Sequence, residues 1–507
     1  MPEDNKKADA VTWRDLPNKD QLFLLALCRL SEPLSNTCLL PYIFYLIKST
    51  ISPPDVQASR ISELSGILVA AFPLAQCTTS IPCGRLSDSH GRKSIILLGL
   101  FVSALSNLAF GFSRTFAALL FWRIIAGLAN GNIGVMRTMT AEIVKEKTYQ
   151  TRAFLLLPFI FNSGTIAALA LGGCLADPVF NLPWLFGPHG TLNFSGNPKG
   201  VAWAAKHPYA LPALFNATVL GLSLLLATLW LRETLEGKPG TSDPSLTTGC
   251  TLSRQLSRLF RRHPHYIAIP LNDLETTTDK PKPKPLPATR LTFTSIWNPR
   301  ILTALLSFTL LPLHNASFMH ILPLYLSTPP STRLNTSLFL FTGGLGLSPK
   351  FIGLTISIPG TLAIPLQPLV YPYLQSRLTT LSLFRLSLFV FLPIYIAAPY
   401  LCLASRGWRE IGLAVVVGCQ IMTRSVAIPS AVILLTEAVQ DKRVLGTVHG
   451  VGGMGAGLAR AVGPAVGGWV FGMGLEMGIV GMVWWGWLGV VAILSLGAAY
   501  LMVEEEG

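Results

Sequence analysis

The chain has 507 residues, half of them hydrophobic and only 13% charged, and its mean hydropathy is +0.51. Soluble domains carry about 25% charged residues, so this composition excludes an ordinary string of soluble domains and favours a membrane protein. The formal net charge of +14 would suit a nucleic-acid partner. The basic residues gather instead in alternate loops between apolar runs, which is typical of membrane topology.

Apolar runs long enough to cross a bilayer recur along the chain, since a spanning helix needs about 20 residues. The first six lie near residues 21–47, 65–83, 94–112, 116–139, 153–175 and 210–231. A second six lie near residues 300–326, 349–371, 381–404, 411–436, 447–472 and 478–502. Paired sets are typical of transporters built from repeats. We therefore expect an all-α membrane protein whose twelve transmembrane helices form two six-helix bundles, 21–231 and 300–502.

The segments outside these bundles are polar. Residues 1–20 and 503–507 form the expected tails, and residues 232–299 form a central loop rich in Pro, Thr, Lys and Arg. The alternating Lys and Pro of residues 280–285 cannot form a helix, which favours a flexible tether. The alternative is a lipid-binding or regulatory role for the basic residues Arg258, Arg261 and Arg262.

The basic residues also predict the orientation. They cluster before the first run, after the second, after the fourth and after the tenth, at Lys6, Lys7, Arg14, Lys19, Arg85, Arg92, Lys93, Lys145, Lys147, Arg152, Lys442 and Arg443. By the positive-inside rule these loops and both termini face the cytosol, across either the plasma membrane or the vacuolar membrane. Two glycosylation tripeptides, at Asn193 and Asn335, then fall in non-cytosolic loops.

Catalytic and metal-binding motifs are missing from the sequence. The eight cysteines have no Cys-x-x-Cys spacing and fall mostly inside apolar runs, so we read them as packing residues. The chain has no phosphate-binding loop, nucleophile elbow or His-Glu-x-x-His helix. We therefore expect neither an enzyme nor a protein with a metal or cofactor.

The strongest motif is the polar stretch Gly84-Arg85-Leu86-Ser87-Asp88-Ser89-His90-Gly91-Arg92-Lys93, between the second and third runs. A loop that joins two spanning helices lies outside the lipid and satisfies its own backbone groups. Asp88 and Arg92 then lie at cytosolic helix ends, where a carboxylate can stabilise a helix N-terminus or pair across the bundle.

Written as Gly-x-Leu-Ser-Asp-x-x-Gly-Arg-Lys, this stretch resembles the signature of major facilitator superfamily transporters. Arg123-Ile-Ile-Ala-Gly127 resembles their Arg-x-x-x-Gly element. The run from Leu445 to Gly468 resembles the eleventh helix of a narrower group, the fungal and plant zinc-induced-facilitator-like and tetracycline-resistance-like drug:proton antiporters. Two departures are Ser89, where a basic residue is frequent, and Ala168-Leu169, where the antiporters carry Gly-Pro.

The resemblance implies a gate at the cytosolic helix ends. Its expected members are Gly84, Asp88, Gly91, Arg92 and Lys93. Glu142 and Glu437, at pseudo-equivalent ends of the fourth and tenth runs, either make similar latch contacts or are solvated helix ends.

Charged residues inside the first bundle predict a proton-coupling site, because charges persist in lipid only where they pair or face water. Arg29 and Glu32 are three residues apart and share a helical face. Counted along their helices, Glu32 and Arg123 lie at similar depths, so we expect them to face each other near the midplane, with Arg29 nearby. The alternative is a static ion pair that fixes helix register.

The second bundle carries cations without matching acids. Arg424 and Arg460 lie inside the tenth and eleventh runs, and His314 and His320 lie inside the seventh. The arginines, with His314, are the expected substrate-binding residues and would favour an anionic solute. Backbone carbonyls could satisfy the arginines instead, and His314 could be a hydrogen-bonded core residue.

Taken together, the sequence predicts a monomeric carrier that moves a small organic solute across a membrane, exporting it in exchange for protons. The alternatives are a facilitator or proton symporter of the same fold, and a transporter-like nutrient sensor that does not transport.

Overall fold

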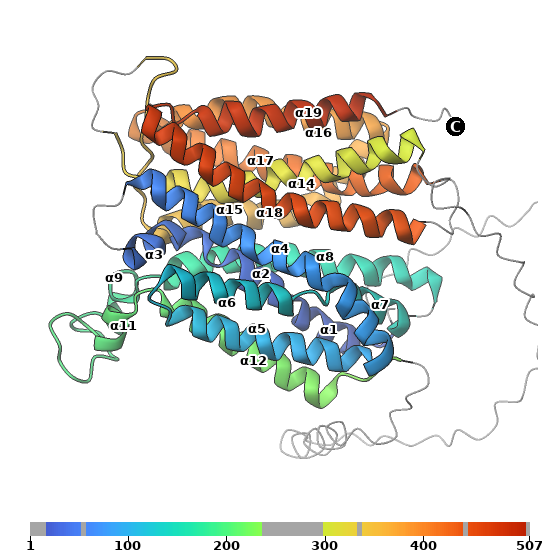
Figure 1. The fold of residues 1–507 in the computed structure, drawn as a ribbon, viewed down its shortest axis with the longest axis horizontal. Helices are drawn as coiled ribbons and strands as arrows, with labels where there is room; N and C mark the ends of the chain where they lie inside the picture. The colour runs from blue at the N-terminus through green and yellow to red at the C-terminus, as the bar shows by residue number, and fades with distance from the viewer. Residues whose placement is uncertain are drawn as a thin grey trace, which may run out of the picture.

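The computed structural model describes residues 17–51, 57–144, 146–235, 298–331, 337–439 and 445–502. These residues are mostly helical, and among them the extended pairing is limited to an isolated bridge between Pro330 and Gly343. Figure 1 shows the helices lying roughly parallel in two groups, one from each half of the chain. The predicted all-α architecture is confirmed.

The first half contains a broken N-terminal region, several long helices and a short helical cap. Its elements are α1 (Lys19–Arg29), α2 (Ser31–Thr37), η1 (Leu40–Tyr42), α3 (Ile43–Thr50), α4 (Ala58–His90), α5 (Arg92–Gly111), α6 (Phe116–Ala129), α7 (Ile133–Ile143), α8 (Lys147–Leu175), α9 (Pro178–Asn181), α10 (Pro183–Phe186), α11 (Ala202–Lys206) and α12 (Ala210–Trp230).

The second half repeats the pattern of long helices. Its elements are α14 (Pro299–Ser327), α15 (Pro349–Gln375), α16 (Thr380–Ala397), η3 (Ala398–Cys402), α17 (Arg406–Glu437), α18 (Leu445–Met477), the π-helical η4 (Val483–Gly489) and α19 (Val490–Tyr500).

Eight helical segments of the described chain are long and apolar enough to cross a membrane. The other four expected runs fall on α1–α3, α8, α15 and α18. The first of them, 21–47, is divided because Pro33 and Pro41 have no N–H for the helical bonds to Arg29 and Thr37. The break places Glu32 directly after the end of α1.

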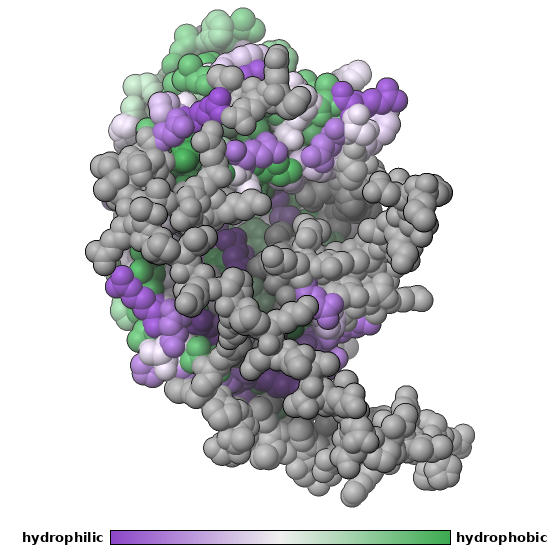
Figure 2. Space-filling view, turned by 90° about the vertical axis from the view of Figure 1, so that its right-hand side faces the viewer, coloured by the Kyte–Doolittle hydropathy of each residue, from purple (hydrophilic) through white to green (hydrophobic). Residues whose placement is uncertain are grey.

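The two ends of the molecule differ. At the end that carries α9 and α11, called here the cap end, the hydroxyl of Tyr45 donates to the carbonyl of Leu347 at 2.6 Å and joins the two halves. A single apolar cluster also crosses between the halves, including Tyr42, Phe318 and Ile352. We call the opposite end, where α4 meets α5, the signature end. Figure 2 looks onto this end and shows hydrophilic side chains lying among hydrophobic ones.

Glycines let two helix pairs cross in backbone contact between the halves. A Cβ on Gly468 of α18 would lie 2.6 Å from the Ser62 carbonyl of α4, and one on Gly173 of α8 would lie 2.4 Å from the Pro349 carbonyl of α15. Both crossings lie toward the cap end. The structure is therefore held together at the cap end by contacts that admit no side chain.

We expect Gly468→Val to destabilise the purified protein by about 1–3 kcal/mol, because its side chain overlaps the backbone of α4. Gly418→Val is the matched control, since a Cβ there meets nothing within 4 Å. Thermal unfolding in detergent measures the difference. Equal melting temperatures for the two variants would contradict the close crossing.

Candidate functional site

The centre of the molecule holds an ion-pair cluster around Glu32, whose side chain is 1% exposed. Arg29 and Glu32 form an ion pair across the break between α1 and α2. Arg460 of α18 also pairs with Glu32, with Nη1 3.1 Å from Oε1. Because α2 belongs to the first half and α18 to the second, this carboxylate joins the two halves electrostatically.

Polar side chains from three further helices surround the break. Asn130, between α6 and α7, accepts a hydrogen bond from Ser31 at 2.9 Å and donates to Ser103 at 3.0 Å. Gln76 of α4 donates to the Asn130 carbonyl at 3.1 Å and also hydrogen-bonds Glu32. The network satisfies the Asn130 carbonyl, at the break between α6 and α7, and ties that break to the one between α1 and α2.

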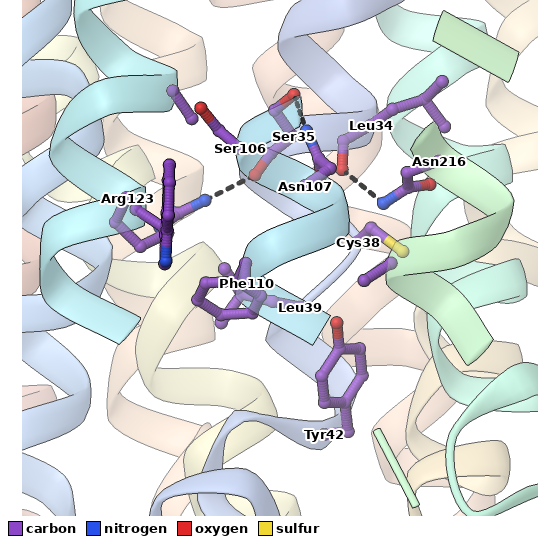
Figure 3. Close-up of a pocket in the computed structure, with 13 residues that line it drawn as sticks. Leu34, Ser35, Cys38, Leu39, Tyr42, Ser106, Asn107, Phe110, Arg123 and Asn216 are labelled. Carbon is purple, nitrogen blue, oxygen red and sulfur yellow. Dashed lines mark hydrogen bonds between the residues drawn. The ribbon is translucent and has the colours of Figure 1, made fainter. Parts of the chain in front are cut away.

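Arg123 is not where the sequence placed it. Instead of facing Glu32, its guanidinium donates to the Ser35 and Leu68 carbonyls and to the Asn36 side chain. Figure 3 shows Arg123 pointing toward Ser35 beside a small cavity of about 20 Å³, room for about one water molecule. Arg123 therefore stabilises the interrupted first helix and is not the partner of Glu32.

The sequence analysis missed Arg137 on α7. This side chain is exposed and interacts electrostatically with Arg29, Glu32 and Arg460. Its signal was available, since Arg137 is a charged residue inside the expected run 116–139. The sequence does not show that Arg137 lies near Glu32, because this proximity depends on the break in the helix at Asn130.

The second half corrects two expectations. Arg460 has an acidic partner from the other half, so it is not an unmatched cation. His314 is fully buried, hydrogen-bonded through Nδ1 to the Tyr395 hydroxyl at 2.8 Å and packed against Phe391, so it is a core residue and does not line a binding site. Arg424 is partly buried, and no described residue forms a hydrogen bond or ion pair with it.

His320, from the same helix as His314, lies between the halves. Its Nε2 is 3.0 Å from the Ser65 hydroxyl of α4, and no described polar group reaches its Nδ1. This contact adds to the crossing of α4 with the second half.

The expected gate is an ordered cluster at the signature end. Arg92 pairs with Asp88 and, at 3.3 Å, with Glu142, and it donates to the Ser87 hydroxyl at 2.8 Å. Lys93 reaches the Thr228 carbonyl at 3.0 Å. These groups all belong to the first half, so the contacts seen here do not latch one half to the other.

The turn itself is shorter than the motif suggested. Gly84 lies inside α4 with open space where a Cβ would be, because the helix continues to His90. Gly91 alone reverses the chain, with a φ of 103° that favours glycine. Ser89 is exposed and bonds its neighbours Leu86 and His90.

Glu233 is a second residue that the sequence analysis missed, since it was assigned to the flexible central loop. Its carboxylate oxygens accept hydrogen bonds from the backbone N–H groups of Arg92 and Lys93, with N–O distances of 2.8 and 3.0 Å, and so cap the start of α5. It also accepts from the N–H groups of Thr234 and Leu235. The start of the central loop therefore contacts the Arg92 cluster.

Three further predicted positions stay predictions. Glu437, at the end of α17, is exposed. Asn193 lies in the loop after α10, where its amide donates to the carbonyls of Pro188 and Asn197 at 2.9 Å. Asn335 lies outside the described residues.

Known proteins share this arrangement along most of the chain. Residues 25–464 match the model of the Major Facilitator Superfamily. The chain belongs to the major facilitator superfamily. This is a family of transporters, not enzymes, so the chain is an integral multi-pass membrane protein.

Two superfamily relatives show the branch. The major facilitator superfamily multidrug transporter mfsB of Aspergillus fumigatus is 30% identical, over 97% of this chain and 85% of that protein. Protein ZINC INDUCED FACILITATOR 1 of Arabidopsis thaliana is 24% identical, over 87% of this chain and 82% of that protein. The resemblance to the zinc-induced-facilitator-like branch is confirmed.

A solved superfamily structure shows the same fold. The bacterial homologue of the human lysosomal transporter Spinster, in an inward-facing and unoccupied conformation, matches with a TM-score of 0.62. The match is 14% identical and covers 96% of this chain and 97% of that one.

We expect Glu233→Ala to lower the free energy of unfolding by about 1–2 kcal/mol, because the first N–H groups of α5 lose their cap in this superfamily member. Thermal unfolding of the purified protein is the measurement. Glu476→Ala is the control, since Glu476 is exposed and has no described hydrogen bond or ion pair. A Glu233 variant as stable as the Glu476 variant would contradict the capping role.

Proposed function

We propose that this chain is a secondary active transporter that exports a small organic solute in exchange for protons, by alternating access, as a monomer. The names of its relatives support export, since one is a multidrug transporter and another, 26% identical, is the efflux pump azaK of Aspergillus niger. We place the signature end and both termini in the cytosol, of either the plasma membrane or the vacuolar membrane, from the distribution of basic residues.

One observation carries the coupling proposal: a buried carboxylate, Glu32, that is shared by one arginine from each half. A buried charge is tolerated only while it is paired. Loss of the carboxylate charge on protonation removes the attraction to Arg460, the partner from the second half. Binding and release of one proton then changes how strongly the halves are held together.

The conformation supports alternating access. Close glycine crossings join the halves toward the cap end, whereas at the signature end the contacts of Arg92 with Asp88 and Glu142 stay within the first half. We propose that the Asp88–Arg92–Glu142 cluster and the Glu233 cap act as the gate, exchanging these contacts within one half for contacts between halves when the signature end closes. Glu437 at the end of α17 is the proposed counterpart in the second half.

The test is proton-driven flux in vesicles that contain the reconstituted protein, under an imposed pH gradient. The solutes are benzoate, benzamide and benzamidine, which share a ring and differ in charge. We expect Glu32→Gln to abolish uphill movement of the transported solute, because a neutral amide cannot exchange a proton. Downhill exchange should persist, which shows that the variant is folded.

Glu63→Gln is the matched control. Arg60 and Glu63 also form an ion pair with three-residue spacing, but on α4, with side chains 61% and 31% exposed. This variant should transport as the unmodified protein does. Uphill transport at the normal rate by the Glu32 variant would reduce the cluster to a static ion pair and overturn the coupling proposal.

Proton symport is the second candidate, and one observation favours it. Three arginines surround the single carboxylate, so an anionic solute would bind best when Glu32 is protonated. The direction of the pH gradient that drives uphill transport distinguishes the two: an antiporter moves solute toward the acidic side and a symporter moves it away.

A further inference from the structure

The charges around Glu32 do not balance. Arg29, Arg137 and Arg460 contribute three positive charges against one negative charge, and these are the charged groups that face Glu32 from α1, α7 and α18 in the described part of the chain. Charges at the depth of a bilayer are costly unless they are paired or face a water-filled path. The excess positive charge on the exposed Arg137 and the partly exposed Arg460 favours an anionic counterion.

We propose that Arg137 and Arg460 form a binding site for an anionic group, and that the transported solute is a carboxylate-bearing organic anion. This inference rests on the proposed transport function, favours its second candidate, proton symport, and names the substrate class. The site lies between α7 of the first half and α18 of the second, so a bound anion would touch both halves.

Arg460 has the free capacity that such a site needs. It uses Nη1 on Glu32, while its Nε is buried and has no hydrogen-bond partner among the described residues. Its side chain is nevertheless 37% exposed, so Arg460 is not sealed inside the protein. A guanidinium offers five donors in a planar fork that matches a carboxylate, and most of that fork is free here.

Arg137 supplies the second cation. Its side chain is exposed, and within the described ranges it forms no hydrogen bond or ion pair. His449 of α18 interacts electrostatically with Arg137, which places α18 beside this arginine as well. The nearest acid along its helix, Glu142, is already paired with Arg92. Arg137 is thus held near two other cations with no acid of its own except the shared Glu32.

The same geometry links anion binding to the proton. Protonation of Glu32 leaves all three arginines without a protein counterion, so it strengthens anion binding. An anion on Arg460 in turn weakens the hold of Arg460 on Glu32. Binding of a proton to Glu32 and binding of an anion to the arginines therefore strengthen each other. This positive coupling is the sign expected of symport.

The experiment measures binding of benzoate, benzamide and benzamidine to the purified full-length protein, by competition and by thermal stabilisation. We expect benzoate to bind in preference to the neutral and cationic compounds. Arg137→Gln and Arg460→Gln should each weaken benzoate binding about tenfold or more, because each removes a charge-assisted contact. Glu32→Gln should strengthen it, because the variant mimics the protonated state.

Arg60→Gln is the control, since it removes an equal charge from an exposed pair on α4 and should leave benzoate binding unchanged. Retention of benzoate binding by both arginine variants, a preference for benzamidine, or binding of none of the three compounds would overturn the anion site. A protein that binds benzoate but moves no solute in the vesicle assay keeps the anion site and refutes the transport proposal. Proton-driven flux of benzamidine alone would keep the transport proposal and refute the anion site.

Discussion

The structure depends on one buried carboxylate that two halves of the chain share. Glu32 lies directly after a proline-induced break and is held by Arg29 from its own half and by Arg460 from the other. Removing one partner of such a buried pair leaves an uncompensated charge, which is strongly unfavourable. The relation between the halves and the charge state of this group are therefore coupled by electrostatics, whatever solute the protein carries.

The fold was predictable because the signal for a membrane-spanning helix lies within one continuous stretch of sequence. Runs of about 20 apolar residues require helices in lipid, and the stretch from Gly84 to Lys93 marks where one helix must end. The boundary was less predictable: α4 continues to His90, since polar residues extend a helix beyond the lipid as readily as they end it. Only Gly91, with its positive φ, terminates it.

The site was predictable in part. The spacing of Arg29 and Glu32 places them on one face, and the structure pairs them. Counting residues along helices gives depth but not direction around the axis, so it paired Glu32 with Arg123 when the partner was Arg460, 428 residues away. Glu233 was hidden for another reason. It begins a polar segment, and its capping role depends on where α12 ends relative to α5.

The glycine crossings have a consequence for motion. Where Gly468 meets Ser62 and Gly173 meets Pro349, backbone faces backbone with no room for a Cβ between them. Helices with interdigitated side chains resist sliding, because each side chain must leave the gap that it fills. At the glycine contacts the two helices can pivot or separate with little steric hindrance. The crossings can therefore act as the points about which the two halves rotate.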